Sequence, residues 1–340
     1  MKMRKSAVSV IIALVAIVSL NIQPISAQER WGYIDTKGKM VIKPAFEYAA
    51  EFHEGLAPVQ VGTEWGYINM SGKIVIKPRF YEANIFSGGF AAVSIIDGED
   101  AFCGFIDKEG KYLVNPAYTM VSAFRDDIAL VQDDEKCGFI NGLGQLIIAP
   151  VYEFAQPFSE GLAPVAVDGI WGYINPAGYM RIARQYQSAD SFSEGLAAVE
   201  LNDLWGFIDL GGKMVIENQF AVAMGFSEGL ARVRWGDVWG FVNKEGTYSV
   251  LPQYDDASDF HEGLAAVQQG RLWGFIDKEG KLVIKPQFEE VGDFHEGLAR
   301  IYTNGLQGYI DKTGKTVVEP QFLNASDFHQ GRAAVMPKVK

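Results

Sequence analysis

A five-residue element recurs along the chain and constrains its fold more than any other feature. It reads WGYID at Trp31–Asp35 and WGYIN at Trp65–Asn69, and successive copies begin 34 residues apart except for one step of 38. The nine copies begin at Trp31, Trp65, Cys103, Cys137, Trp171, Trp205, Trp239, Trp273 and Gln307. Gly recurs seven residues after each start, Phe or Tyr fifteen after and Phe twenty-one after, and an FxEGLA-like closing loop follows. Such fixed-period similarity predicts one repeat architecture rather than independent domains.

The local pattern within each copy predicts β-structure. Short runs of aromatic and β-branched residues are bounded by Gly, Pro, Asn and Asp, and none keeps the spacing of a helix of ordinary length. We expect three antiparallel strands in each unit, as at Leu56–Val61, Trp65–Asn69 and Ile74–Phe80. An Asx residue opens the second turn and Gly ends it, as Asn69 and Gly72 do. The Pro found in seven of nine third strands indicates a strand end or a sheet edge.

Nine units can form an open array or a closed ring. The repeats begin almost at the second strand of a unit (Trp31) and end just after a first strand (Arg332–Pro337), so the two ends could complete one unit. However, nine units exceed the usual four to eight propeller blades, and 34 residues are few for a four-stranded blade. We therefore expect a solenoid-like or superhelical array, with a closed propeller-like ring as the alternative.

The first 27 residues have the layout of a secretory signal peptide. Basic residues at Lys2, Arg4 and Lys5 precede an apolar run, Ala7–Leu20, which is shorter than the ~20 residues needed to cross a bilayer. Cleavage near Ala27 would leave residues 28–340 as a single repeat domain. We expect a secreted or periplasmic protein of the cell envelope, without stable membrane insertion after cleavage.

The charge and the motifs exclude several functions. Thirty Lys and Arg against 42 Asp and Glu give a net charge of −12, which argues against a nucleic-acid partner. The sequence contains no Gly-rich phosphate loop, HExxH or CxxC, so it predicts no catalytic residues, cofactor or metal site. The recurring acidic residues of the closing loops, such as Glu54 and Glu296, need only a solvated role.

Two groups of residues stand in repeated positions and allow two interpretations. Cys103 and Cys137 replace Trp in adjacent copies, either as a disulfide or as two free thiols that fill aromatic positions. All four His residues of the chain follow the recurring Phe, in copies seven, eight, nine and one: His261, His295, His329 and His53. A metal row is conceivable, but duplication of similar units explains the pattern without bringing the imidazoles around one ion.

The departures from the repeat are the best binding candidates. Trp235 lies in a turn outside every repeated position and next to Arg234, whereas the recurring Trp is expected to be part of the core. Arg181 and Arg184 belong to an irregular segment, RIARQYQ, and four extra residues fall in the stretch 94–102.

The WG[YF][IV][DN]xxG element, the VIKPxF-like strand and the closing loop together resemble the WG-repeat family of bacterial proteins, from Trp31 to about Val335. The resemblance implies an all-β repeat scaffold, often exported, without a common catalytic activity. We therefore expect a non-catalytic binding protein whose partner is an envelope protein or a cell-wall glycan. A carboxylate-dependent glycan hydrolase is the alternative, because a pair of carboxylates leaves no local motif.

Overall fold

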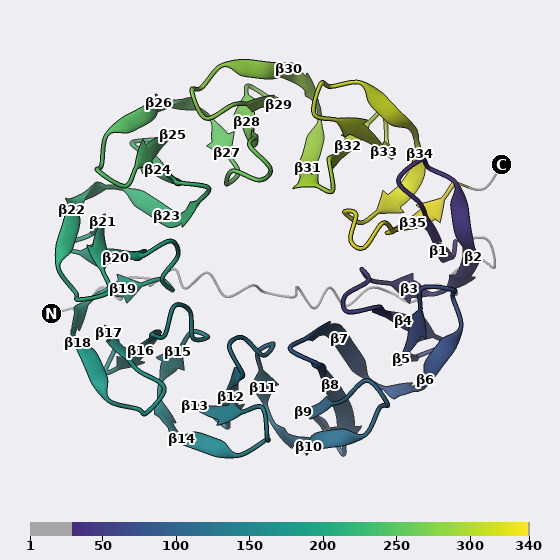
Figure 1. Ribbon diagram of the computed structural model, residues 1–340, viewed down its shortest axis with the longest axis horizontal. Coiled ribbons are helices and arrows are strands. Elements are labelled where there is room, and N and C mark those ends of the chain that lie inside the picture. The colour runs from purple at the N-terminus through teal and green to yellow at the C-terminus, as the bar shows by residue number, and fades with distance from the viewer. Residues whose placement is uncertain (1–28, 339–340) are drawn as a thin grey trace, which may run out of the picture.

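The computed structural model describes residues 29–338, which form strands, turns and bends and no helix. No helix within this range is long and apolar enough to span a membrane. The signal peptide and its cleavage site near Ala27 lie outside the described residues. Figure 1 shows the strands grouped into small sheets that follow one another around a ring.

Seven of the eight sheets have four antiparallel strands, so the expected three-stranded unit is one strand short. The additional strand lies innermost and consists of only two residues in five sheets, which is too short for a recognisable alternation. The first four sheets contain β3 (Tyr48–Ala49), β4 (Leu56–Val61), β5 (Glu64–Asn69) and β6 (Ile74–Phe80); β7 (Glu82–Ser87), β8 (Phe90–Asp97), β9 (Asp100–Ile106) and β10 (Tyr112–Tyr118); β11 (Met120–Val121), β12 (Ile128–Asp133), β13 (Lys136–Asn141) and β14 (Leu146–Tyr152); and β15 (Phe154–Ala155), β16 (Ala163–Val167), β17 (Ile170–Ile174) and β18 (Met180–Tyr186).

The next three sheets repeat this order from the inner to the outer strand. They contain β19 (Ser188–Ala189), β20 (Leu196–Leu201), β21 (Leu204–Asp209) and β22 (Met214–Phe220); β23 (Val222–Ser227), β24 (Leu230–Trp235), β25 (Val238–Asn243) and β26 (Tyr248–Tyr254); and β27 (Asp256–Ala257), β28 (Ala265–Gln269), β29 (Leu272–Ile276) and β30 (Leu282–Phe288). In all seven of these sheets the outer strand is an edge. Five of these outer strands contain the recurring Pro, which an edge strand tolerates, so the sheet edge predicted from the sequence is confirmed.

The two ends of the chain share the remaining sheet and close the ring. Its seven strands are β31 (Glu290–His295), β32 (Leu298–Thr303), β33 (Leu306–Asp311), β34 (Thr316–Ala325), β35 (Ala333–Pro337), β1 (Trp31–Ile34) and β2 (Met40–Phe46). β1 pairs with β35, with Gly32 opposite Val335 and Ile34 opposite Ala333. The preference for an open array is therefore wrong, because this pairing satisfies both terminal edges with hydrogen bonds that an open array would leave exposed.

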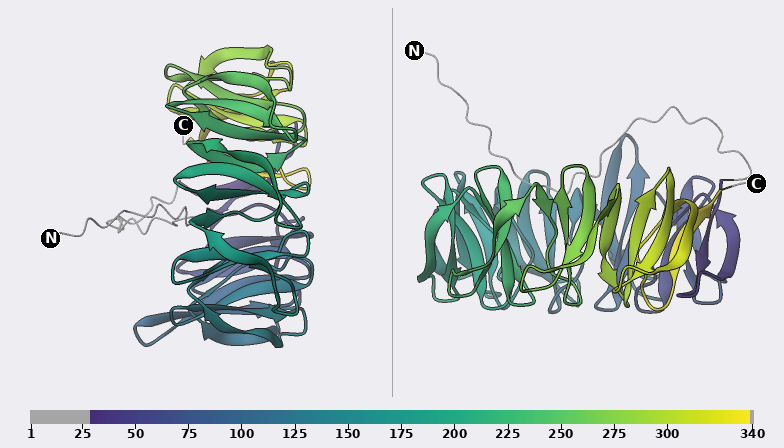
Figure 2. Two further views of the ribbon diagram at one scale, coloured as in Figure 1. Left: turned by 90° about the vertical axis from the view of Figure 1, so that its left-hand side faces the viewer. Right: turned by 90° about the horizontal axis from the view of Figure 1, so that it is seen from above.

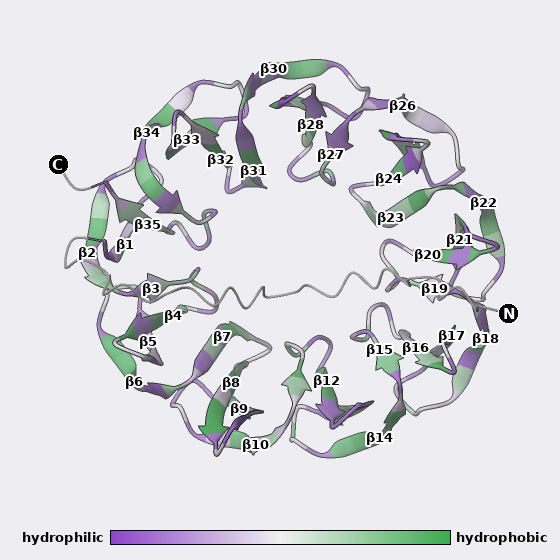
Figure 3. Ribbon diagram, turned by 180° about the vertical axis from the view of Figure 1, so that it is seen from behind, coloured by the Kyte–Doolittle hydropathy of each residue, from purple (hydrophilic) through white to green (hydrophobic). Residues whose placement is uncertain are grey.

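The hydrophobic core lies between neighbouring sheets and is divided into small clusters. One cluster joins Trp171, Tyr173 and Tyr186 of one sheet to Val199 and Ile208 of the next. Another crosses the closure, packing Ile34 of β1 with Tyr309, Val318 and Val335 near the C-terminus. Figure 3 shows hydrophobic stretches alternating with hydrophilic ones along the outer strands. The ring is thus held by contacts between adjacent units and has no single central core.

The Gly of each WG pair is required by the close approach of the outer strand. A Cβ on Gly206 would lie 2.5 Å from the carbonyl oxygen of Ile216 and 2.8 Å from the amide nitrogen of Asn218. The register between β21 and β22 shifts at this point, as in a β-bulge. Because the obstructing atoms are backbone, a side chain at this position cannot be accommodated by a rotamer change.

The four inserted residues lengthen one hairpin. β8 and β9 continue to pair through Ile96 and Ala101, up to Asp97 and Asp100. In Figure 2 this hairpin rises above its neighbours on one face of the ring. The insertion that interrupts the 34-residue period is therefore an extended β-ribbon.

Candidate functional site

A cleft of about 940 Å³ is lined by residues of four successive sheets, including their inner strands β11, β15, β19 and β23. Its apolar lining includes Met120, Phe154, Trp171, Trp205 and Met224. Phe154 is 44% exposed, and its ring lies 6.3 Å from that of Trp171 at an interplanar angle of 21°. The cleft is thus a concave surface of partly exposed aromatic and Met side chains, with Trp171 almost fully buried at its wall.

Two variable positions of the repeat supply seven of the sixteen residues that line this surface. Met120, Phe154, Ser188 and Val222 occur seventeen residues after the start of their copies, at the beginning of β11, β15, β19 and β23. Two residues further on, Gln156, Asp190 and Met224 stand at equivalent positions. The ring brings these positions side by side. The residues at these positions in four copies therefore form one surface, and its composition differs from that of the same positions elsewhere in the ring.

The polar groups of the cleft are fixed by contacts between sheets. The side chain of Gln156 donates hydrogen bonds to Ala189 O at 3.2 Å and to Asp190 Oδ1 at 3.4 Å, and it accepts from the amide and hydroxyl of Ser191 at 3.0 Å. The Tyr173 hydroxyl donates to Asp190 O at 2.8 Å. Burial raises the pKa of Asp190 above its usual range, with the hydrogen bond from Gln156 acting in the opposite direction.

The recurring Trp has a double role, as two of its copies show. Trp171 is 7% exposed and packs in a core cluster, as the sequence predicted for this position. Trp205 is half-buried, packs against the next cluster and also lines the cleft. This surface was not predicted from the sequence. The signal for it in the sequence is the apolar residue at one variable position in nearby copies: Met120, Phe154 and Val222.

The binding residues nominated from the sequence lie outside the cleft, whereas Cys137 lines it. Trp235 is 55% exposed at the tip of the β24–β25 hairpin, paired with Val238. The guanidinium of Arg234 lies 5.8 Å from the ring centroid of Trp239. Arg234 therefore packs on the ring of Trp239, and the neighbouring Trp235 is exposed.

Arg181 and Arg184 lie on β18, the outer strand of their sheet, and both are exposed. Arg184 donates a hydrogen bond to Val167 O at 3.1 Å. It occupies the position that Pro holds in seven other copies. The structure does not bring these two residues together with Trp235, which is on another sheet.

Cys103 and Cys137 are both free cysteines and lie on different sheets, in β9 and β13. Of the two alternatives, the structure therefore has the two free thiols and not the disulfide. Burial raises the pKa of both thiols, and the carboxylate of Glu82 adds to the effect at Cys103. Cys137 packs in a core cluster, which agrees with a thiol that fills an aromatic position.

The closing loops form a second set of contacts at the other end of the inner strands. The amide of Gly263 donates a 2.9 Å hydrogen bond to the carboxylate of Glu228. The same hydrogen bond, from a Gly amide to a Glu carboxylate, joins five other pairs of neighbouring loops. Glu228 has a φ of 52°, and Lys278 lies 3.2 Å from its carboxylate. The sequence predicted only contact with solvent for these acidic residues. In the structure each of them also accepts a hydrogen bond that links its loop to the next.

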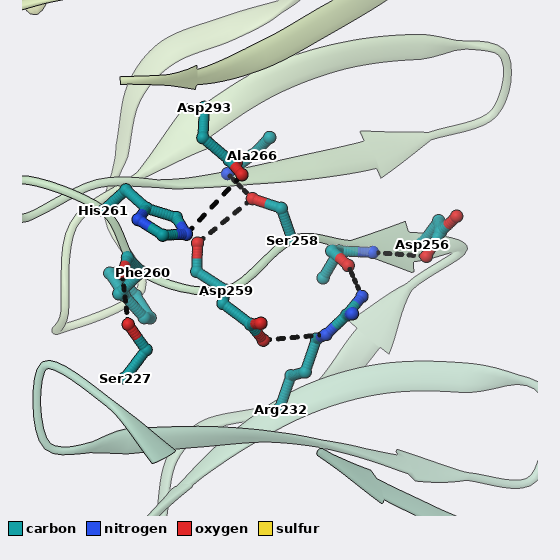
Figure 4. A network of polar contacts seen from close by, with 10 residues as sticks. Ser227, Arg232, Asp256, Ser258, Asp259, Phe260, His261, Ala266 and Asp293 are labelled. Carbon is teal, nitrogen blue, oxygen red and sulfur yellow. Dashed lines mark hydrogen bonds and ion pairs between the residues drawn. The ribbon is translucent and has the colours of Figure 1, made fainter. Parts of the chain in front are cut away.

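Ser or His occupies the position after the recurring inner Phe in eight of the nine copies, and Arg125 occupies it in copy three. In copies four, five and six, Ser159, Ser193 and Ser227 each donate a hydrogen bond to the Phe carbonyl oxygen of the next copy, at 2.6–2.7 Å. Figure 4 shows Ser227 and Phe260 in this contact, next to Arg232, whose side chain bonds Asp259 at 2.8 Å and the carbonyl of Ala257. In the copies that follow, His replaces Ser.

The four imidazoles form a continuous row because the ring is closed. The ring centroids are 5.6 Å apart for His261 and His295, 5.1 Å for His295 and His329, and 4.6 Å for His329 and His53. His261 also lies 3.6 Å from Asp293. Burial and the imidazoles of His53 and His295 hold the pKa of His329 below its usual range, although Glu51 opposes them.

The comparisons with known proteins concern the fold and the family. The chain is similar to the crystal structure of a eukaryotic initiation factor, with a TM-score of 0.60 and 9% identity over 92% of this chain and 99% of the other. It also matches apo AztD from Citrobacter koseri (TM-score 0.43, 11% identity, 92% and 100% coverage) and Kluyveromyces lactis Hsv2 (0.41, 9%, 75% and 93%). Identities this low bear on the fold alone. No curated protein matches the chain.

The family comparison covers nearly the whole described chain. The family described as WG containing repeat matches residues 31–62, 65–98, 104–137, 138–169, 171–205, 205–237, 239–273, 273–306 and 308–336. These nine matches coincide with the nine copies of the sequence element and with the strands of the ring. The chain therefore belongs to the WG containing repeat family.

Proposed function

We propose that this protein is an exported, non-catalytic binding protein that holds a cell-wall glycan in the cleft over β11, β15, β19 and β23. The observation that carries the proposal is the combination of Phe154, Trp171 and Trp205 with fixed polar groups in one concavity. Sugar rings have apolar faces that stack on aromatic side chains and hydroxyl groups that need fixed hydrogen-bond partners. Gln156 and Asp190 supply such partners.

The choice of a glycan over an envelope protein follows from the shape of the surface. Protein interfaces bury about 800 Å² on each side and are usually extended, whereas this cleft is a concavity of the size typical of small ligands. The net charge of −12 argues against nucleic acid as the ligand. The proposal that the protein is exported rests on the signal-peptide pattern of residues 1–27.

The test is co-sedimentation of the purified chain with protease-stripped bacterial wall sacculi. Phe154→Ser is the main variant, because Ser188 already occupies this position in the next copy and the change is compatible with the fold. Trp235→Ala removes an exposed Trp outside the cleft and is the matched control. We expect Phe154→Ser to weaken binding about tenfold and Trp235→Ala to leave it unchanged. Equal loss in both variants, or binding only to envelopes that retain their proteins, would refute the glycan proposal.

The alternative is a glycan hydrolase, and the raised pKa of Asp190 is the observation that favours it. A carboxyl group whose pKa is raised keeps its proton to a higher pH than usual, which suits a general acid beside a bound sugar. Release of soluble fragments from the same sacculi, abolished by Asp190→Asn but with binding retained, would support this alternative. Intact sacculi after prolonged incubation would remove it.

A further inference from the structure

Three side chains at the ring closure have the composition and spacing of a metal site. Ligand atoms of Glu51, His53 and His329 all lie within 4.8 Å of one another, and all three residues are partly buried. The Glu51 Oε2 atom lies 3.3 Å from His329 Nε2 and 3.7 Å from His53 Nε2. The three residues come from copies one and nine, at opposite ends of the sequence.

These distances agree with the coordination of a small divalent cation. Bonds of about 2.0–2.1 Å in a tetrahedral site place neighbouring ligand atoms about 3.3–3.4 Å apart. The two Glu–His distances are within a few tenths of an ångström of that value, so small side-chain movements would complete the geometry. Three protein ligands would leave a fourth position for water.

One ligand atom lacks any other partner. His53 Nε2 is buried and has no hydrogen-bond partner among the described residues. Its distance of 3.7 Å from Glu51 is too long for a hydrogen bond. A buried nitrogen with an unused lone pair is costly without a partner, and a metal ion would supply one.

The sequence shows that acid and imidazole occur together. Glu51, Asp259, Asp293 and Asp327 stand two residues before His53, His261, His295 and His329. The other five copies have Ile85, Ala123, Pro157, Ser191 and Gly225 at the acidic position. Of the four acid–His copies, only the closing pair brings three ligand atoms together in the described structure.

We propose that Glu51, His53 and His329 bind one Zn²⁺-class transition-metal ion at the junction between the first and last copies. Two imidazoles and one carboxylate suit Zn²⁺ better than Ca²⁺ or Mg²⁺, which take oxygen ligands. His53 follows β3, in the loop before β4, and His329 lies between β34 and β35. The ion therefore joins the two ends of the repeat array and stabilises the closed ring, and none of its three ligands lines the glycan cleft.

The experiment is titration of the dialysed chain, free of any histidine tag, with ZnCl₂ by calorimetry and with CoCl₂ by visible absorption. His329→Ser is the test variant, because Ser is the natural residue of this position in copies four to six. His261→Ser is the matched control, since His261 is in the same position but not in the trio. Glu51→Gln is a second test variant that keeps the shape of the side chain.

We expect one Zn²⁺ per chain, a tetrahedral Co²⁺ spectrum and a rise in Tm of ~2–5 °C with saturating Zn²⁺. His329→Ser and Glu51→Gln should each weaken Zn²⁺ binding about 100-fold and abolish the rise in Tm, whereas His261→Ser should preserve both. No binding of either ion, or equal loss in His261→Ser and His329→Ser, would overturn the assigned site. Retained binding in His329→Ser would do so too.

Discussion

The amide of Gly55 donates a 2.9 Å hydrogen bond to the side-chain oxygen of Gln330, across 275 residues of the chain. Six other pairs of neighbouring closing loops make the same contact with Glu as the acceptor. The last copy therefore contacts the first in the same way as neighbouring copies do at six other junctions of the ring. Together with the pairing of β1 and β35, this contact shows that the ring closes through an interaction that other neighbouring copies also make.

Removal of the last strand should open the ring. We expect a chain that ends at Arg332 to lose roughly 3–5 kcal/mol of unfolding free energy, because it loses the buried side chain of Val335 and exposes the edge of β1. Urea denaturation measures the loss, and small-angle scattering should show a larger radius of gyration. A chain that ends at Pro337 is the control and should match the full chain. Unchanged stability after loss of β35 would contradict the closed ring.

Gly206→Ala should destabilise the protein by about 1–3 kcal/mol, because the new Cβ meets backbone atoms of β22 at 2.5–2.8 Å. Gly225→Ala is the matched control. Its Cβ would meet only the Ser193 Cβ at 3.7 Å, an ordinary contact, so its effect should stay within about 0.5 kcal/mol. Urea midpoints for the two variants make the comparison. Equal effects would show that the WG glycine is not selected by this close approach.

The stability of the ring should fall at acidic pH, because the Glu carboxylates of the closing loops become protonated. Burial raises the pKa of Glu228, but the Lys278 ammonium and the Gly263 amide outweigh it and hold the pKa below the ordinary 4.5. The same balance, with Lys312 and Gly297, lowers the pKa of Glu262. A depressed folded-state pKa stabilises the fold above pH ~4.5, and this contribution is lost as the pH falls through the folded-state value.

The pH dependence can be measured as Tm at pH 7, 5, 4 and 3. The double variant Glu228→Gln and Glu262→Gln should lose less stability between pH 5 and pH 3 than the natural chain, because Gln does not titrate. Gln330 shows that an amide can still accept the Gly hydrogen bond. Changing the exposed Glu64 and Glu109 to Gln controls for net charge alone. Parallel pH curves for the natural chain and the double variant would refute this assignment.

Both cysteines should remain as thiols without reductant. We expect two thiols per denatured chain by colorimetric assay, and a Tm that reductant changes by less than about 1 °C, because no disulfide restricts the unfolded state. In the native protein, Cys137 should react more slowly than Cys103, since it is more buried and both thiol pKa values are raised. Fewer than two thiols in the unreduced chain would indicate that the pair oxidises.

The repeated residues alone allowed the all-β class, the nine units and the chemistry of their turns to be predicted. The 34-residue period locates each unit, and the turn from Asn69 to Gly72 forms as expected, with a 2.8 Å bond from the Gly72 amide to Asn69 O. These features depend on residues close in sequence, whose conformational preferences act locally. The four-stranded sheet was missed because segments such as Ser188–Ala189 are too short to show a pattern.

Only the tertiary structure decided what lies next to what across copies. Whether Gly32 meets Val335 depends on a small rotation between successive sheets, added over nine interfaces, and no local sequence pattern encodes that sum. The cleft at Phe154 and the trio at His329 follow from the same rotation, because each joins equivalent positions of neighbouring copies. The sequence by itself determines the unit, and the packing of unit against unit determines the ring and the candidate sites on it.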